Sequence, residues 1–262
     1  MHKRVRHLAA GLAVALLAAM GPARAADAPF SDHELIDGFV KTVFGEERPS
    51  RRTSAASRLI KKFTRPVSYA IVSTSSVDRR ETLRHFMTSL SSAVDYLTLV
   101  ETDDVGAAQM VIFLTDRADY RAVIRNTVWD GVDTAFLEEN ACSAVLAARR
   151  SGIEHANVYL VADESFLALS HCMVEEVAQS LGPANDSPDL ADSIFNDVSE
   201  INVFGVFDWF ILSMLYHPAV QPGMTEAEVR PILPAVIADV SRRLPEVLSR
   251  GSGLSHYSAA SR

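Results

Sequence analysis

The chain has 262 residues, of which 48% are hydrophobic and 22% are charged, and its formal net charge is −8. This is the composition of a globular protein, and it excludes a disordered chain, a collagen-like repeat and a small disulfide-rich scaffold. The 237 residues that follow the predicted leader are enough for one good hydrophobic core or two small ones.

Residues 1–25 are predicted to be an export signal. Three Lys or Arg residues among the first six precede an apolar run that is too short to span a bilayer comfortably. Ala23 and Ala25 then form a small-x-small cleavage pattern, so we expect the mature chain to begin at Ala26. No cysteine stands near the cut, and no later stretch reaches 18 apolar residues. We therefore expect a periplasmic protein that is neither a lipoprotein nor a transmembrane protein.

The charge of the mature chain argues against nucleic acid as a partner. The leader carries four basic and no acidic residues, so its removal takes the net charge to about −12, whereas nucleic-acid binding needs a basic surface. Residues 48–65 are the exception, with seven basic and no acidic side chains. This segment is interpreted as a solvated connector or, alternatively, as a patch for an anionic partner or membrane headgroups.

Apolar periodicity and turn residues predict five helices and five strands. The helices are expected over residues 30–44, 78–96, 164–181, 204–216 and 226–248, the last interrupted near Pro231 and Pro234. The strands are expected over residues 67–73, 96–100, 109–114, 140–147 and 153–162. Helices and strands are interspersed without strict alternation, which favours an α+β fold with a small mixed sheet. We expect an N-terminal helix and basic connector over residues 26–65, one domain over residues 66–250, and a flexible tail over residues 251–262.

Cys142 and Cys172 are the only cysteines of the chain. An even number of cysteines in an exported protein favours a disulfide bond between them. A free and reactive Cys172 is the alternative.

The helix expected over residues 164–181 carries the most informative pattern. Its apolar stripe consists of Val174, Val177, Ala178 and Leu181. Glu175 and Gln179 are four residues apart and therefore adjacent on the opposite, polar side, which Cys172 and Glu176 border. Gly182 is placed to end the helix, and Asn185 and Asp186 follow it. The simplest interpretation is a solvated helix face followed by a glycine stop.

The same run resembles the metzincin zinc-peptidase motif, HExxHxxGxxH followed by Asp, with all three ligand histidines replaced. Glu175, Gln179 and Asn185 stand at the three ligand positions, while Glu176 keeps the position of the general base. Gly182 keeps the glycine that turns the chain toward the third ligand. The resemblance implies a zincin-like domain, with a long helix, an active-site-type helix and C-terminal helices.

A second segment, residues 213–218, resembles the methionine-containing turn beneath the metal of metzincins. Met214 would be its methionine, and Tyr216 would stand where some members place a tyrosine beside the metal. The run from Cys172 to Asp186 and the segment from Leu215 to Met224 also resemble an uncharacterised proteobacterial family of exported proteins that is known only as a domain of unknown function. This resemblance covers residues 67–224.

The substituted positions argue against zinc chemistry. Imidazole suits zinc, whereas a carboxylate with two amide oxygens could hold calcium or manganese only weakly. Without a metal, Glu176 has no activated water from which to accept a proton. His171, His155 and His217 lie close enough in the predicted fold to supply a replacement ligand, although structural roles explain them as well. Serine-hydrolase, phosphate-loop and paired CxxC motifs are absent.

Together these features predict an exported, non-catalytic metzincin-like protein that needs no cofactor. It would act as a binding or accessory module of the cell envelope, with an envelope protein or a peptide as its partner. The alternative is an active metal-dependent peptidase or hydrolase with an unusual oxygen-ligand site and a weakly bound divalent cation.

Overall fold

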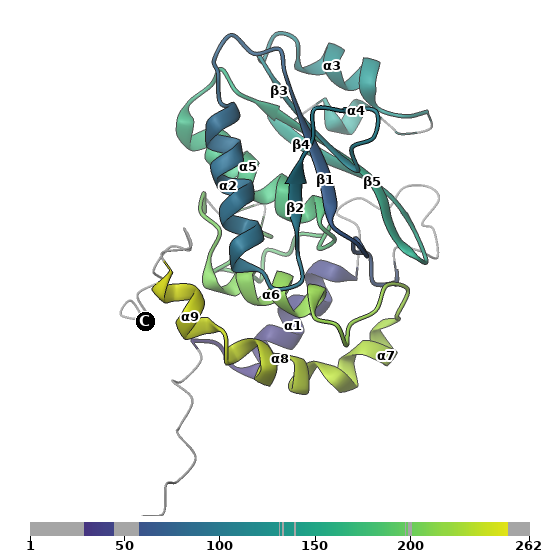
Figure 1. Ribbon diagram of the computed structural model, residues 1–262, viewed down its shortest axis with the longest axis vertical. Coiled ribbons are helices and arrows are strands. Elements are labelled where there is room, and N and C mark those ends of the chain that lie inside the picture. Colours follow the sequence, from purple (N-terminus) through teal and green to yellow (C-terminus); the bar gives the residue numbers. More distant parts are fainter. Residues whose placement is uncertain are drawn as a thin grey trace, which may run out of the picture.

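The computed structural model describes residues 29–44 and 58–250, except for residues 131, 133, 139, 197, 199 and 200. The predicted export signal, most of the basic connector and the predicted tail lie outside these residues. In the described part, a five-stranded sheet occupies one end and a group of helices the other (Figure 1).

The strands form one mixed sheet in the order β2-β1-β3-β5-β4. They are β1 (Val67–Ser73), β2 (Leu99–Glu101), β3 (Met110–Thr115), β4 (Cys142–Arg149) and β5 (Gly152–Val161). All neighbours are parallel except β4, which pairs with β5 in the antiparallel sense and forms one edge of the sheet. The predicted α+β class and the mixed sheet are confirmed, and each predicted strand is found within three residues of its expected bounds.

Both faces of the sheet are covered, as the alternation of buried side chains requires. On one face, residues of the central strands join the main core together with helices α2 (Arg80–Ala93) and α5 (Phe166–Ser180); these residues are Tyr69, Met110, Ile112, Val158 and Leu160. On the other face, Tyr120 and Ile124 of α3 (Tyr120–Thr127) and Leu137 of α4 (Thr134–Leu137) cover a smaller cluster. Helices α3 and α4 were not predicted from the sequence.

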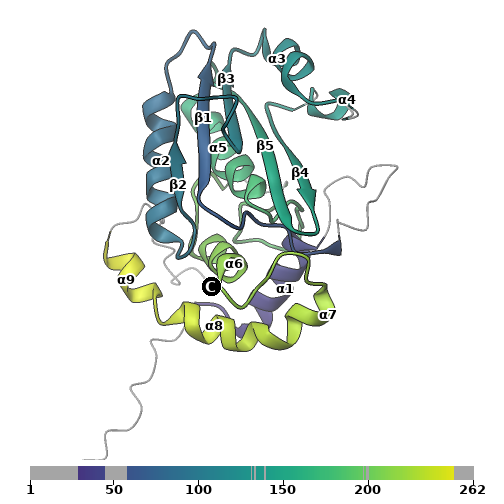
Figure 2. The same cartoon turned by 45° about the vertical axis from the view of Figure 1, so that its right-hand side comes forward.

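The remaining helices lie along one side of the sheet and below it (Figure 2). They are α1 (Asp32–Val43), α2 (Arg80–Ala93), α5 (Phe166–Ser180), α6 (Val206–Tyr216), α7 (Glu226–Val229), the 3-10 helix η2 (Arg230–Ile232), α8 (Leu233–Ser241) and α9 (Leu244–Ser249). The predicted C-terminal helix is thus broken into four pieces. Three of these pieces have a proline in their first two positions, namely Pro231, Pro234 and Pro245, where the missing N–H costs least.

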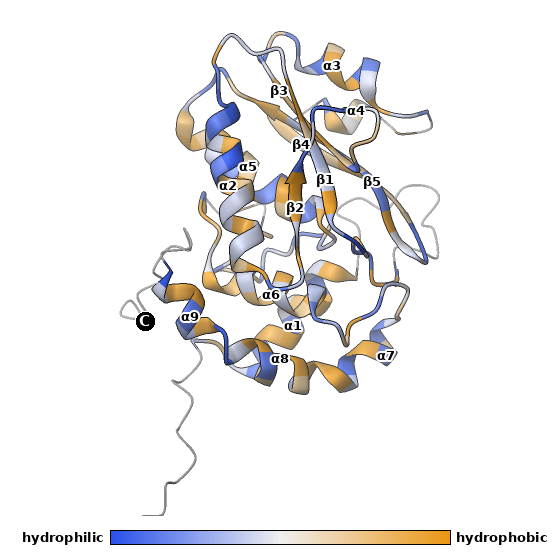
Figure 3. Ribbon diagram, viewed as in Figure 1, coloured by the Kyte–Doolittle hydropathy of each residue, from blue (hydrophilic) through white to orange (hydrophobic). Residues whose placement is uncertain are grey.

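Helix α6 is the centre of the helical part. Every one of its residues is buried, and α1 and α8 pack against it. By contrast, α8 and α9 alternate orange and blue in Figure 3, as expected of helices that bury one side only. Leu35 and Phe39 of α1 belong to the same core cluster as the strands, so the predicted N-terminal segment packs as part of the main body.

The described end of the basic connector is not a solvated segment. Arg58 and Arg65 are exposed, but Lys61 and Lys62 are buried. The Lys62 ammonium donates hydrogen bonds to the carbonyl oxygens of Leu215 and His217, at 3.0 and 3.3 Å. Burial lowers the pKa of Lys62 to about 8. The prediction of a solvated connector is therefore wrong here, because the last carbonyls of α6 are buried and need donors.

The predicted disulfide bond is present. The Sγ atoms of Cys142 and Cys172 are 2.01 Å apart, and the bond joins the start of β4 to the middle of α5. The alternative of a free Cys172 is therefore wrong. Within the described ranges, no helix combines the length and apolar character that a membrane span requires.

Removing the disulfide should lower the free energy of unfolding by about 3–4 kcal/mol, because it closes a loop of 30 residues in the unfolded chain. Urea denaturation of the wild type and of the double variant Cys142→Ala/Cys172→Ala measures this difference. A reductant should destabilise the wild type and leave the variant unchanged. Equal urea midpoints for the two proteins would contradict the prediction.

Candidate functional site

Helix α5 carries the predicted motif and lies against β4 and β5. Ser165 caps its first turn by accepting a hydrogen bond from the Ala168 N–H at 3.1 Å. Every residue from Cys172 to Ser180 is buried, and Glu175, Glu176 and Gln179 are only 7–9% exposed. The interpretation of this face as solvated is therefore wrong. Helical spacing identifies a polar face, but it does not show that another segment covers it.

A pocket of about 280 Å³ lies between this face of α5 and the beginning of β4, next to the disulfide bond that joins them. The beginning of β4 forms one wall, α5 forms another, and Asp186 closes the pocket from the segment that follows α5. The polar side chains of its lining are Asn140, Ser143, His171, Glu175, Glu176, Gln179 and Asp186. This lining contains three carboxylates, one histidine, and no lysine or arginine.

His171 and Glu175 form an ion pair within the pocket. The Nε2 atom of His171 lies 3.2 Å from Oε2 of Glu175, and Nδ1 lies 2.6 Å from the carbonyl oxygen of Ile201. Both partners are acceptors, so both ring nitrogens donate and the ring is an imidazolium. The hydrogen bond to Glu175 raises the pKa of His171 to about 9, against the opposing effect of partial burial. In this state His171 is a cation rather than a metal ligand.

The predicted ligand positions are only partly brought together. Glu175 and Gln179 both line the pocket, where the side-chain amide of Gln179 donates to the two carboxylate oxygens of Asp186 at 2.9 Å each. The Asn185 side chain instead donates to the carbonyl oxygen of Lys41 in α1, at 2.7 Å. The residue after Gly182 that reaches the pocket is therefore Asp186. From the sequence, Asp186 was expected only as the aspartate that follows the motif, in support of the three ligand positions.

Gly182 is required at the end of α5 by its backbone conformation and by close packing. Its φ is +137°, a region that side chains rarely allow. A Cβ atom at this position would lie 2.2 Å from the Lys61 carbonyl oxygen and 2.8 Å from Cδ2 of Leu215. The glycine therefore lets the chain turn where α5, α6 and the segment around Lys61 meet.

Met214 and Tyr216 are buried in α6, and neither lines the pocket. Met214 lies within the helix and not in a turn. The Tyr216 hydroxyl donates to the carbonyl oxygen of Leu181 at 3.0 Å, and burial raises the pKa of Tyr216. Tyr216 thus supports the end of α5, whereas Met214 is a buried residue of the α6 core.

The other two candidate histidines lie elsewhere. His155 contacts the side-chain oxygen of Asn157 through Nε2 at 3.0 Å and packs edge-on against Trp129. His217 lines a different pocket, next to α8. His171 was one candidate among three, and its spacing of four residues from Glu175 is the signal that distinguishes it.

Metal binding would depend on few donors. Donor atoms of Cys142, Glu175 and Glu176 lie within 4.8 Å of one another. The Cys142 sulfur is committed to the disulfide and offers no thiolate, which leaves two carboxylates. Calcium takes six to eight oxygen ligands, so this pair would need several water molecules to complete the coordination.

A family model described as "Protein of unknown function (DUF2927)" matches residues 32–235. The chain belongs to this family. The DUF2927 match confirms the resemblance to a domain of unknown function, and it begins with α1 and ends within α8, so it includes the whole pocket. No curated protein matches the chain.

We predict that the His171–Glu175 pair makes stability depend on pH. Because the pKa of His171 is raised from 6.5 to about 9 in the folded state, its contribution is complete below pH 6.5 and is lost as the pH rises through about 9. With allowance for solvent screening, this contribution is about 1–2 kcal/mol. Urea denaturation at several pH values should show wild type more stable than His171→Gln at pH 6 and equal to it above pH 9.

Lys62 titrates in the same pH range, but it does so in both proteins. The difference between their free energies of unfolding therefore reports on His171 alone. An NMR titration of the imidazole gives the pKa directly. A midpoint near 6.5 would show that the ion pair does not hold the proton.

Proposed function

We propose that this DUF2927 protein is an exported, non-catalytic binding module of the cell envelope that holds an extended peptide along the free edge of β4. The N-terminal leader predicted from the sequence and the disulfide bond support export to an oxidising compartment. The pocket beside β4 would receive a side chain of the bound peptide.

The backbone of β4 carries this proposal. The Val161 N–H donates to the Ala141 carbonyl, whereas the Ala156 N–H points the other way and donates to Gln109. The backbone N–H and C=O groups of odd-numbered β5 residues therefore point toward β4. Their partners in β4 are Ser143, opposite Tyr159, and Val145, opposite Asn157. By the same alternation, the backbone groups of Ala144 and Leu146 point away from the sheet. No described strand occupies that side of β4.

An open strand edge is a template for another strand, and proteins use it to bind extended peptides. A register shift between Ala147 and Ala148 bends the far end of β4, which limits the usable edge to its first part. That part is the wall of the pocket.

The charge of the pocket favours a basic side chain in the bound peptide. Three carboxylates and one imidazolium line it, so a lysine or arginine would improve the electrostatic balance. The hydrogen bonds within the pocket support binding rather than zinc catalysis. Glu175 pairs with His171, and Gln179 presents its amide nitrogen to Asp186.

A zincin-like frame with replaced ligands remains part of the proposal. In its support, a helix with Glu175 and Gln179 on one buried face runs into the Gly182 turn. The position of Asn185 against α1 argues that the third ligand position has taken on a packing role.

Peptide binding can be tested with a matched pair of probes. One is an acetylated seven-residue peptide of alternating valine and threonine with a central lysine, and the other has glutamate in its place. Calorimetry should show that the lysine peptide binds at least about tenfold tighter, a difference of about 1.4 kcal/mol. Ala144→Pro should abolish binding of both, because it removes an outward N–H without removing a ladder bond. Glu176→Gln should reduce only the preference for lysine.

Ala144→Ser is the matched control, since it keeps the N–H and should bind like the wild type. Equal binding by Ala144→Pro and the wild type would refute the edge proposal. The alternative function is tested in the same samples by adding calcium or manganese. Metal-dependent cleavage of the peptide would identify a hydrolase instead.

A zinc titration tests the zincin-like frame. The triple variant Glu175→His/Gln179→His/Asn185→His places three imidazoles at the metzincin spacing, each needing to lie roughly 2.0–2.1 Å from one centre. We expect submicromolar zinc binding by the folded variant and negligible binding by the wild type. The new imidazoles lack hydrogen-bond partners for their other ring nitrogens, which should cost about 10–100-fold in affinity. If only a variant with Asp186→His in place of Asn185→His binds zinc, the frame is not that of a metzincin.

A further inference from the structure

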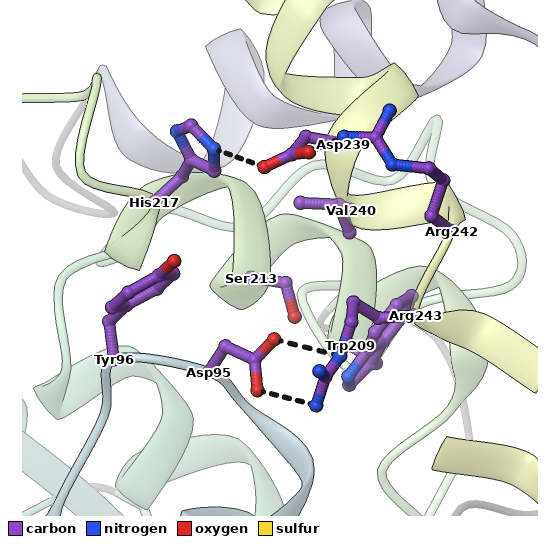
Figure 4. A pocket seen from close by; sticks show the side chains of 9 residues that line it. All are labelled: Asp95, Tyr96, Trp209, Ser213, His217, Asp239, Val240, Arg242 and Arg243. Carbon is purple, nitrogen blue, oxygen red and sulfur yellow. Dashed lines mark hydrogen bonds and ion pairs between the residues drawn. The ribbon is translucent and has the colours of Figure 1, made fainter. Parts of the chain in front are cut away.

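A second pocket, of about 160 Å³, lies between α6, α8 and the turn after α2 (Figure 4). It shares no lining residue with the pocket beside β4. Trp209 and Val240 form its apolar walls, and polar side chains form the rest. The Trp209 indole N–H is already used, because it donates to the Ala93 carbonyl at 2.8 Å.

Ser213 points its hydroxyl into this pocket, as Figure 4 shows. The residue is only 6% exposed, and its Oγ is a buried atom for which the described residues provide no hydrogen-bond partner. Serines within helices commonly bond to the carbonyl of the preceding turn, as Ser170 does to Phe166 at 2.8 Å. A buried hydroxyl without a partner costs free energy, so Ser213 is set to donate to or accept from something within the pocket.

The charges around Ser213 are already balanced. Asp95 pairs with Arg243 at 3.1 Å, and Asp239 pairs with Arg242. Each carboxylate nevertheless has about four lone-pair positions, more than these contacts use. The pocket therefore offers hydrogen-bond acceptors and donors without an excess of either charge.

His217 does not turn this group into a catalytic triad with Ser213. Its Nδ1 accepts a hydrogen bond from the Ala219 N–H at 3.1 Å, and its Nε2 lies 3.0 Å from Oδ2 of Asp239. Burial lowers the pKa of His217, in agreement with a neutral ring. Both nitrogens are thus occupied, and neither can accept the proton of Ser213.

Tyr96 stands at the rim of the pocket in a strained conformation. Its φ of 64° is rare for a bulky side chain, and 69% of the residue is exposed. Its ring is edge-on to His217, with 6.4 Å between the ring centroids. An aromatic ring held in this way, at a cost in backbone strain, indicates a functional contact.

We propose that this pocket binds a neutral polyhydroxylated ligand, a monosaccharide unit, which stacks on Tyr96 and hydrogen-bonds to Ser213, Asp95 and Asp239. An ionic ligand would have to break an existing ion pair, and an apolar ligand would leave the polar walls without partners. A sugar ring offers an apolar face for the tyrosine and hydroxyls that both donate and accept. The volume suits one ring.

Glucose and N-acetylglucosamine are the probes, and alanine and acetate represent zwitterionic and anionic ligands. Saturation-transfer NMR should show millimolar or tighter binding of at least one sugar and no binding of alanine or acetate. Ser213→Ala should weaken sugar binding at least fivefold and leave the melting temperature unchanged or higher, because no hydrogen bond of the free protein is lost. Tyr96→Gly should raise the melting temperature, because glycine adopts positive φ freely, and should also abolish binding.

Phe166→Ala is the control for an exposed aromatic residue, since Phe166 is 56% exposed and lines neither pocket. It should bind sugar like the wild type. The proposal is overturned if neither sugar binds at millimolar concentration, if alanine or acetate binds instead, or if both pocket variants bind sugar like the wild type. A large loss of stability in Ser213→Ala would also overturn it, by showing that the hydroxyl has a structural partner.

Discussion

A helix that is buried on all sides must satisfy the polar groups at both of its ends within the protein, and α6 imposes this constraint on the fold. At its beginning, Asp208 accepts hydrogen bonds from the Ser193 hydroxyl at 2.7 Å and from the Gly205 N–H at 2.9 Å. Burial raises the pKa of Asp208 to about 6, although these donors oppose the shift. At its end, the ammonium of Lys62 binds the last carbonyls. A negative group at the start and a positive group at the end both complement the helix dipole.

The contacts that satisfy the polar groups of α6 also hold in position the segments that form both candidate sites. The segment that brings Lys62 to the end of α6 carries the Lys61 carbonyl to Gly182, and only a glycine fits that approach. The turn after α5 is thereby fixed, and with it the carboxylates beside β4. On the other side, the Trp209 indole holds the last turn of α2 through the Ala93 carbonyl. Tyr96 follows that turn and reaches the rim of the second pocket.

The strands, the long helices and the disulfide could be predicted from the sequence, because apolar periodicity and cysteine count report on local and covalent structure. Helix α3 was missed although Tyr120, Val123, Ile124 and Thr127 have helical spacing, because the segment has only eight residues and half of them are polar. The burial of Glu175 could not be predicted. It depends on β4 and on the segment after Gly182, and spacing within one helix contains no information about either.

The two pockets differ in what their linings lack: one lacks sufficient positive charge, and the other lacks a described hydrogen-bond partner for a buried hydroxyl. This difference determines which ligands would suit them. Beside β4, the hydrogen bonds of Gln179 and His171 are made within the site, but carboxylates outnumber cations in the lining. A positively charged group from outside would reduce the cost of burying those carboxylates. Around Ser213 the charges are balanced by ion pairs, but a buried hydroxyl has no described partner. A neutral molecule with hydroxyl groups would supply that partner without disturbing the ion pairs, and because the two pockets share no lining residue, the two proposals are independent of each other.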